Sequence, residues 1–127
     1  MGFRYRVKTK KDTINKEAVP KYYAVPVRSG KVDITHMAEV LSDRSSLTPG
    51  DIQATIIGLV DIMESYLHQG YSVELDNIGI FTLSVTSDGY ETPKDCTPHR
   101  VRAQKVCFRA APKLKKNLKY VKFERDK

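Results

Sequence analysis

Residues 48–85, TPGDIQATIIGLVDIMESYLHQGYSVELDNIGIFTLSV, decide the fold, because the spacing of their apolar residues changes at Gly70. Before this glycine, apolar residues recur at helical spacing over about five turns: Ile52, Ile56, Leu59, Val60, Met63, Tyr66 and Leu67. After it, they alternate with polar residues as in strands: Val73 and Leu75, then Phe81, Leu83 and Val85. The stretch therefore predicts a long amphipathic helix followed by two strands.

Local signals predict where these elements begin and end. Thr48 is suited to the N-cap, Pro49 to the first helical position, where its missing N–H costs nothing, and Asp51 to the third position of a capping box. Gly70 can adopt the left-handed conformation that ends a helix. Residues 77–79 offer turn chemistry between the two strands, which predicts a β-hairpin.

The flanking sequence extends this pattern on both sides. Upstream, Asp33 is placed to cap a short helix with one apolar face, formed by Ile34, Met37, Ala38 and Leu41. Downstream, the turn-rich residues 87–98 predict a loop or ribbon tip, and HRVRAQKVCF (99–108) predicts a returning strand. In that strand we expect Val101, Ala103 and Lys105 on one side, and Arg100 and Arg102 on the other.

Both ends of the chain also contain predicted elements. FRYRVKTKK (3–11) and KYYAVPV (21–27) alternate well enough to form strands. Pro112 begins a short basic helix or an irregular tail, KLKKNLKYVKF (113–123), with Leu114, Leu118 and Val121 spaced for one face.

The basic residues lie mainly at the two ends of this chain of 127 residues, which carries a formal charge of +7. Residues 1–31 contain nine Lys or Arg and two acids, and residues 89–127 contain twelve and four. Residues 32–88 contain one basic residue, Arg44, and nine acids. Nucleic acid is the commonest polyanionic partner for such a charge distribution, and solvated basic tails are the alternative.

Several classes of function find no support in the sequence. It has no apolar run of the roughly 18 residues that span a bilayer and no apolar stretch behind the basic N-terminus, so we expect a cytoplasmic protein. It also lacks a phosphate-binding Gly-rich loop, a G-x-S-x-G elbow and an H-E-x-x-H motif. Cys96, His99 and Cys107 lack a fourth zinc ligand at usual spacing, and free thiols are expected. We expect no enzyme activity, cofactor, metal, membrane partner or small-molecule substrate.

The order of these elements resembles the bacterial histone-like HU/IHF DNA-binding family, in a branch with an N-terminal extension. The hairpin residues Val73, Leu75, Ile78, Gly79 and Phe81 match the family's V-x-L-x-x-F-G-x-F pattern, and Lys105, Val106 and Phe108 resemble its closing strand. The resemblance implies an α+β, IHF-like fold: a helix-turn-helix base, a three-stranded antiparallel sheet with an extended β-ribbon arm, and a short C-terminal helix. It places a basic extension at 1–31 and the HU-like domain at 32–127, with the arm at about 84–104.

The same resemblance implies a homodimeric, nucleoid-associated protein that condenses double-stranded DNA largely without sequence preference. An arm-tip proline would bend the duplex, and Pro98 is preferred to Pro93. The DNA-binding residues expected on this basis are Lys94, Pro98, Arg100, Arg102, Lys105, Arg109, Lys113, Lys115 and Lys116.

The chain also departs from the family at the arm tip. ETPKDCTPHR (91–100) stands where the family has R-N-P-x-T-G, and the arm is a few residues shorter. Two alternatives therefore stay open. One is an HU-fold interaction or scaffold module that does not bend DNA, and the other is an RNA-binding variant in which Tyr22 and Tyr23 stack on bases.

Overall fold

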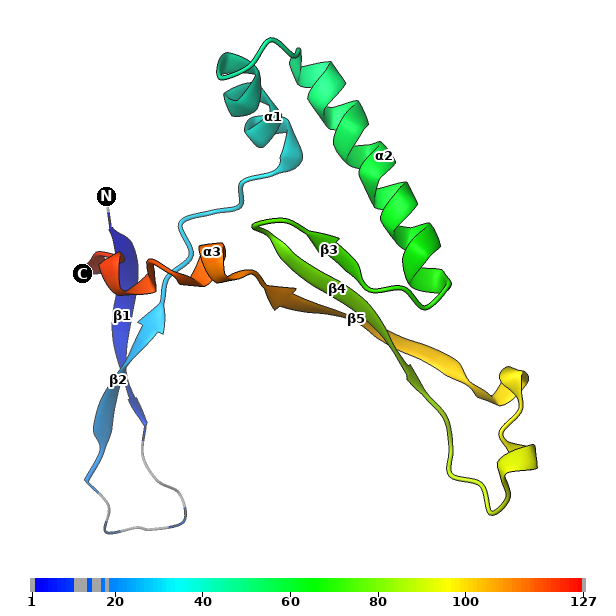
Figure 1. Ribbon diagram of the computed structural model, residues 1–127. Helices are drawn as coiled ribbons and strands as arrows, with labels where there is room; N and C mark the ends of the chain where they lie inside the picture. Colours follow the sequence, from blue (N-terminus) through cyan, green and yellow to red (C-terminus); the bar gives the residue numbers. More distant parts are fainter. Residues whose placement is uncertain (1, 11–13, 15–16, 18, 127) are drawn as a thin grey trace. The chain divides into compact units, whose positions relative to one another are not determined.

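The computed structural model describes residues 2–10, 14, 17 and 19–126. The chain divides into two compact units. The first unit combines both ends of the chain, Met1–Val32 with Asn117–Lys127, and is called the terminal unit. The second unit, Asp33–Lys116, contains the helices and the arm and is called the central unit. Figure 1 shows the elements of each unit, coloured along the sequence.

The central unit is α+β, as the sequence predicts. Its elements in order are α1 (Ile34–Asp43), α2 (Pro49–His68), β3 (Val73–Leu75), β4 (Gly79–Thr86), the 3-10 turns η1 (Pro93–Asp95) and η2 (Pro98–Arg100), β5 (Arg102–Ala110) and α3 (Pro112–Lys115). The strands form one sheet in the order β3-β4-β5, and both pairings are antiparallel. Helices α1 and α2 pack on each other, and α2 also contacts β3 and β4.

Helix capping follows the sequence signals closely. The Asp33 carboxylate accepts a hydrogen bond from the His36 backbone N–H at 3.0 Å, which caps α1. The Thr48 hydroxyl accepts one from the Asp51 N–H at 3.1 Å, which caps α2. Gly70 follows α2 with a φ of 91°, in the region that favours glycine. The predicted starts of both helices are confirmed, and α2 ends at His68, two residues before Gly70.

The hairpin between β3 and β4 is also confirmed. The Ile78 N–H donates to the Leu75 carbonyl at 3.0 Å, and Asn77 has a positive φ of 67°. Gly79 is buried at the start of β4 with a φ of 154°. A Cβ at this position would meet the Arg109 carbonyl oxygen and lie 2.7 Å from the ring of Phe108. The turn therefore requires glycine both for its backbone conformation and for space.

The arm is built from β4 and β5, which run side by side in Figure 1. The prediction that the returning strand begins at His99 is wrong, because β5 begins at Arg102. Pro98 opens the 3-10 turn η2 instead, and the Val101 N–H donates to the Pro98 carbonyl at 3.4 Å. Proline fixes its own φ and supplies no N–H to a strand partner, so the ladder cannot extend through this turn.

The terminal unit is a second small sheet. Its elements are β1 (Phe3–Lys10), β2 (Lys21–Pro26), the 3-10 turn η3 (Leu118–Tyr120) and β6 (Phe123–Arg125), with strand order β2-β1-β6. The antiparallel pairing of β1 with β2 confirms the two N-terminal strands. The parallel pairing of β1 with β6 was not predicted. Residues 117–127 thus belong with the N-terminal strands, and the C-terminal helix is only the four residues of α3.

Few apolar side chains are buried within one copy of the chain. Among the described residues, the buried hydrophobic ones are Ala38, Ile52 and Leu67. Many apolar residues of α2 are exposed, including Ile57, Val60 and Ile62. None of the helices in the described part of the chain is long and apolar enough to span a membrane.

Candidate nucleic-acid interface

A β-bulge in the arm determines which side chains of β5 share a face. Val85 pairs with Ala103 and Ser84 pairs with Lys105, so Gln104 is an extra residue without a partner of its own on β4. The Ser84 hydroxyl donates to the Lys105 carbonyl at 3.3 Å beside the bulge. An extra residue reverses the alternation of the strand beyond it.

The bulge brings Arg102 onto the same face as Lys105 and Arg109. Arg102 pairs with Thr86, Lys105 with Ser84 and Arg109 with Ile80, and directly paired residues share one face of a sheet. We call these three exposed cations the β5 basic face. The expectation that Lys105 shares a side with Ala103 is wrong, because alternation across positions 103–105 is broken by the extra residue.

The β4 side of this face carries hydroxyl groups and no charge. Thr82 pairs with Cys107, and Ser84 and Thr86 pair with Lys105 and Arg102. Hydroxyl groups donate hydrogen bonds to phosphate oxygens as readily as they accept them from other donors. These half-buried hydroxyls were not among the predicted site residues. Their period-two spacing on a strand opposite basic residues is the signal that would have identified them.

The opposite face of the arm is apolar. Phe81 pairs with Phe108, and their ring centroids lie 4.8 Å apart. Leu83 pairs with Val106 on the same face, followed by Val85 with Ala103. Phe108 is 50% exposed and Val106 57% exposed in the single chain. Each arm therefore has one polar, cationic face and one apolar face.

An acid lies beside Arg102 at one end of the β5 basic face. Asp88 Oδ1 is 3.8 Å from Arg102 Nη2, and both side chains are well exposed. An exposed ion pair of this kind contributes little to stability, so Arg102 can exchange Asp88 for a phosphate at small cost.

At the arm tip, Arg100 is occupied within the loop. Its guanidinium lies 5.1 Å from the centroid of the Tyr90 ring, and its Nη1 donates to the Asp95 carbonyl at 3.0 Å. The Thr92 hydroxyl donates to the Asp95 carboxylate at 2.9 Å in the same tip. The prediction that Arg100 and Arg102 extend from one strand face is wrong, because Arg100 belongs to η2. Arg100 holds the tip in shape.

The remaining predicted tip residues project at the two 3-10 turns. Pro93 and Lys94 belong to η1, and Pro98 is the first residue of η2. All three are exposed. The tip therefore presents two prolines and a lysine to its surroundings, and Arg100, also exposed, contacts Tyr90 and Asp95 in the same loop.

The predicted lysines at the end of the central unit line a groove. Lys113, Lys115 and Lys116 surround an open hollow of about 700 Å³ together with Asn77 and Pro112. The Ala111 N–H donates to the Ile78 carbonyl at 2.9 Å, which holds α3 against the β3–β4 turn. We call this the lysine groove.

Arg109 connects the lysine groove to the β5 basic face. Arg109 and Lys113 line an adjoining hollow of about 630 Å³, together with Glu74 and Asp76. The predicted cations therefore form a track from Arg102 along β5 to α3. The Glu74 and Asp76 carboxylates reduce the positive potential of this track near Arg109 and Lys113.

The thiols of Cys96 and Cys107 are free, with Cys96 exposed and Cys107 half-buried. Within the described part of the chain, no group of three or more His, Cys, Asp or Glu side chains could hold a metal ion.

The helix pair, the three-stranded sheet and its cationic arm define an α+β protein of the HU type. The family model HU-HIG, described as an HU domain fused to wHTH, Ig, or glycine-rich motif, matches residues 1–125, and the chain belongs to this family. HU-type domains are architectural and DNA-binding, not enzymatic. The match runs through both units and does not set residues 1–31 apart as an extension.

The fold is also similar to solved structures. One of them is that of a candidate bacterial DNA-binding protein from Bacteroides vulgatus, with a TM-score of 0.66 and 9% sequence identity. The similarity covers 97% of this chain and 47% of that one, so this chain spans about half its length. No curated protein matches this chain.

Proposed function

We propose that this chain is an architectural DNA-binding protein that works as a homodimer and binds duplex DNA largely without sequence preference. The observation that carries the proposal is the β5 basic face, where a bulge aligns Arg102, Lys105 and Arg109 on one side of an extended ribbon. A two-stranded ribbon is narrow enough to follow a DNA groove, as in other architectural proteins.

The chemistry of this face favours phosphates over bases. Guanidinium, ammonium and hydroxyl groups all donate hydrogen bonds to phosphate oxygens, which carry no sequence information. Specific readout in the major groove usually needs Asn, Gln or Arg aimed at base edges from an inserted helix or ribbon. The β5 basic face offers cations three and four residues apart beside short hydroxyl side chains. Binding is therefore expected to be dominated by counterion release.

The lysine groove extends this contact. Lys113, Lys115 and Lys116 lie at the end of the same track of cations and face an open hollow. A duplex held by the arm would meet these ammonium groups with a further phosphate. Their compact charges suit a contact that does not depend on orientation.

Dimer formation is supported by the apolar surface left on one chain. Leu59, Val60 and Tyr66, on the apolar face predicted for α2, are 37–54% exposed, and Val106 and Phe108 are exposed on the apolar face of the arm sheet. Soluble monomers rarely expose contiguous apolar patches of this kind. In a dimer with twofold symmetry, each copy would cover the exposed apolar residues of the other copy with the same surface of its own.

Bending is assigned to the arm tip. Pro98 is exposed at the start of η2, in a tip that Arg100 braces through Tyr90 and Asp95. An apolar wedge between base steps unstacks them at a cost of a few kcal/mol, which wider contact with the bent duplex offsets. We propose Pro98 as the wedge, with Pro93 the second candidate. In the cell, such a protein would act with the nucleoid in the cytoplasm and help to condense DNA.

Fluorescence anisotropy of the full chain with a labelled mixed-sequence duplex of about 30 base pairs tests this function. The expected result is tight binding at about 50 mM salt that weakens by orders of magnitude at about 200 mM. A double-stranded RNA of the same sequence should bind more weakly. Equal affinity at both salt concentrations, preference for the RNA, or selection of one sharp consensus sequence would contradict the proposal.

A further inference from the structure

The sheet of the terminal unit has two chemically different faces. Strand register places four aromatic residues on one face, because paired residues lie on the same side: Phe3, Tyr5, Tyr22 and Phe123. The same register places a row of cations on the other face: Arg4, Arg6, Lys8, Lys10 and Lys21. We call the first of these the aromatic face of the terminal sheet.

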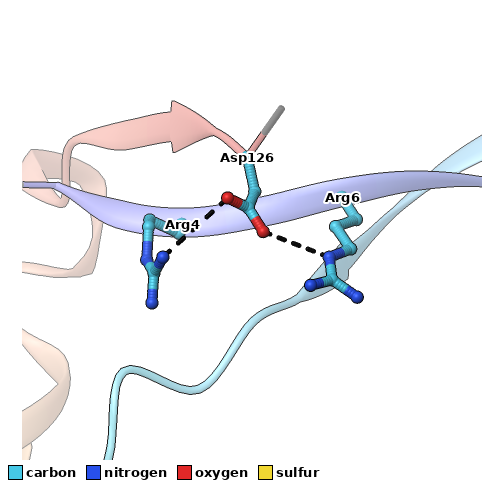
Figure 2. A network of polar contacts seen from close by, with 3 residues as sticks. All are labelled: Arg4, Arg6 and Asp126. Atoms are coloured by element: carbon cyan, nitrogen blue, oxygen red, sulfur yellow. Dashed lines mark hydrogen bonds and ion pairs between the residues drawn. The ribbon is translucent and has the colours of Figure 1, made fainter.

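An acidic residue on the cationic side fastens β6 to β1. Asp126 Oδ2 accepts a hydrogen bond from Arg6 Nε at 3.1 Å, and its Oδ1 lies 3.8 Å from Arg4 Nη1 (Figure 2). The Asp126 N–H also donates to the Tyr5 carbonyl at 2.8 Å. These contacts hold Phe123 beside Phe3, with ring centroids 5.8 Å apart. The contact between the Phe3 and Phe123 rings is therefore fixed by the pairing of β6 with β1.

The aromatic face is open to its surroundings. Tyr22 is 71% exposed, Phe123 63% and Phe3 48%. A groove of about 590 Å³ lies on this face, lined by Phe3, Tyr5, Ala24, Pro26 and Phe123. Exposed rings on a flat sheet present their π-faces to a planar partner, and nucleic-acid bases stack on such surfaces.

Charge indicates what kind of partner fits. The segments that form the terminal unit, 1–32 and 117–127, contain thirteen Lys or Arg and four Asp or Glu. Arg125 pairs with Tyr5, so one exposed cation lies on the aromatic face itself. Aromatic rings beside Arg125, in a unit with an excess of cations, match a polyanion that carries planar groups. The chemistry is complementary to a nucleic-acid strand.

We propose that the aromatic face of the terminal sheet binds single-stranded DNA, with bases stacked on its rings, a phosphate held by Arg125, and the cations of the opposite face adding to the positive potential. A duplex does not suit this surface, because its bases are already stacked and present only their edges. Of the five residues that line the groove, Tyr5 alone has a polar side-chain group, so the groove is poorly equipped to recognise a 2′-hydroxyl. The choice of DNA over RNA rests on the proposed function.

The test uses the full chain and a fluorescein-labelled dT20 oligonucleotide at low salt. Tyr22 and Tyr23 provide a matched pair, since both are exposed on β2 but face opposite sides of the sheet. Tyr22→Ala should weaken dT20 binding by about five-fold or more, and Tyr23→Ala by less than about two-fold. Phe123→Leu keeps an apolar side chain against Phe3 and removes the ring, and it should weaken dT20 binding as Tyr22→Ala does. Circular dichroism of each variant checks that the sheet is intact.

A second arm separates this proposal from the proposed duplex binding. The triple variant Arg102→Ala, Lys105→Ala, Arg109→Ala should weaken binding to duplex DNA. Its affinity for dT20 should stay within about two-fold of that of the parent chain. Failure of the parent chain to bind duplex DNA would contradict the proposed function alone. Unchanged dT20 affinity in Tyr22→Ala and Phe123→Leu, or an equal loss in Tyr23→Ala, would overturn the aromatic face as a DNA site. If Tyr22→Ala and Phe123→Leu lose self-association but still bind dT20 normally, the aromatic face is not a DNA site. Tighter binding of U20 RNA than of dT20 would overturn the choice of DNA.

Discussion

Arg102 and Lys105 lie on the same face of β5, although an odd number of positions separates them. In an uninterrupted strand their side chains would extend to opposite faces. The extra residue Gln104 reverses the alternation between them, opposite the step from Ser84 to Val85. The cationic face of the arm therefore depends on a backbone irregularity as much as on residue type.

Insertion of one alanine between Ser84 and Val85 should separate these cations. The inserted residue would give Gln104 a partner on β4 and restore regular alternation along β5, so Arg102 and Lys105, three positions apart, would extend to opposite faces. Duplex DNA affinity should fall to nearly the level of Arg102→Ala, because a charge on the far side of the ribbon no longer meets the phosphates. Fluorescence anisotropy measures the change. Gln104→Ala is the control, since it keeps the bulge and should bind normally. Equal affinity of the insertion variant and the parent would show that the bulge has no role.

Leu59, Val60 and Tyr66 form an exposed apolar stripe along α2, and this stripe predicts self-association. The 14.4 kDa chain should sediment at about twice its mass at micromolar concentration, because a second copy covers the stripe. Val60→Glu places a charge on this stripe and should shift the equilibrium to monomer. Ala54→Glu adds the same charge to an exposed position of α2 outside the stripe and should leave the dimer intact. A parent chain that sediments only as monomer would rule out the dimer.

Substitution of the tip prolines should reduce DNA bending without a matching loss of DNA affinity. Pro98→Ala removes the proposed wedge while the cations of β5 remain, so affinity should stay within about two-fold and the bend angle should fall. Fluorescence resonance energy transfer between the ends of a labelled duplex measures the angle, with Pro93→Ala in parallel. If the duplex is bent as strongly by a variant that lacks both prolines, neither is a wedge.

Gly79 should be one of the most sensitive positions for stability. Gly79→Ala combines a φ of 154° with a Cβ that meets the Arg109 carbonyl and the Phe108 ring. We expect a loss of about 1–3 kcal/mol in the free energy of unfolding, measured by urea denaturation. A Cβ at Gly89, in contrast, has no heavy atom within 4 Å, and Gly89→Ala should change stability by less than about 0.5 kcal/mol. Equal stability of the two variants would contradict the account of the turn.

Local sequence signals predicted the elements but not all of their partners. The caps at Asp33 and Thr48 and the turn at Asn77 depend on neighbouring residues, so their residue types are sufficient to identify them. The bulge at Gln104 depends on cross-strand register, which alternation within one strand cannot show. The pairing of β6 with β1 joins the two ends of the chain, and no local pattern encodes such a distant contact.

The most direct test of the central claim is the salt dependence of duplex DNA binding by the triple variant Arg102→Ala, Lys105→Ala, Arg109→Ala. Each cation that neutralises a phosphate contributes about 0.9 to the slope of log K against log salt concentration. If the β5 basic faces of both arms of the dimer bind the DNA backbone, the triple variant loses six cations, and its slope should be shallower than that of the parent by about 5.4, with weaker binding to every duplex sequence. An unchanged slope in a folded triple variant would contradict the claim that this face of the arm holds DNA.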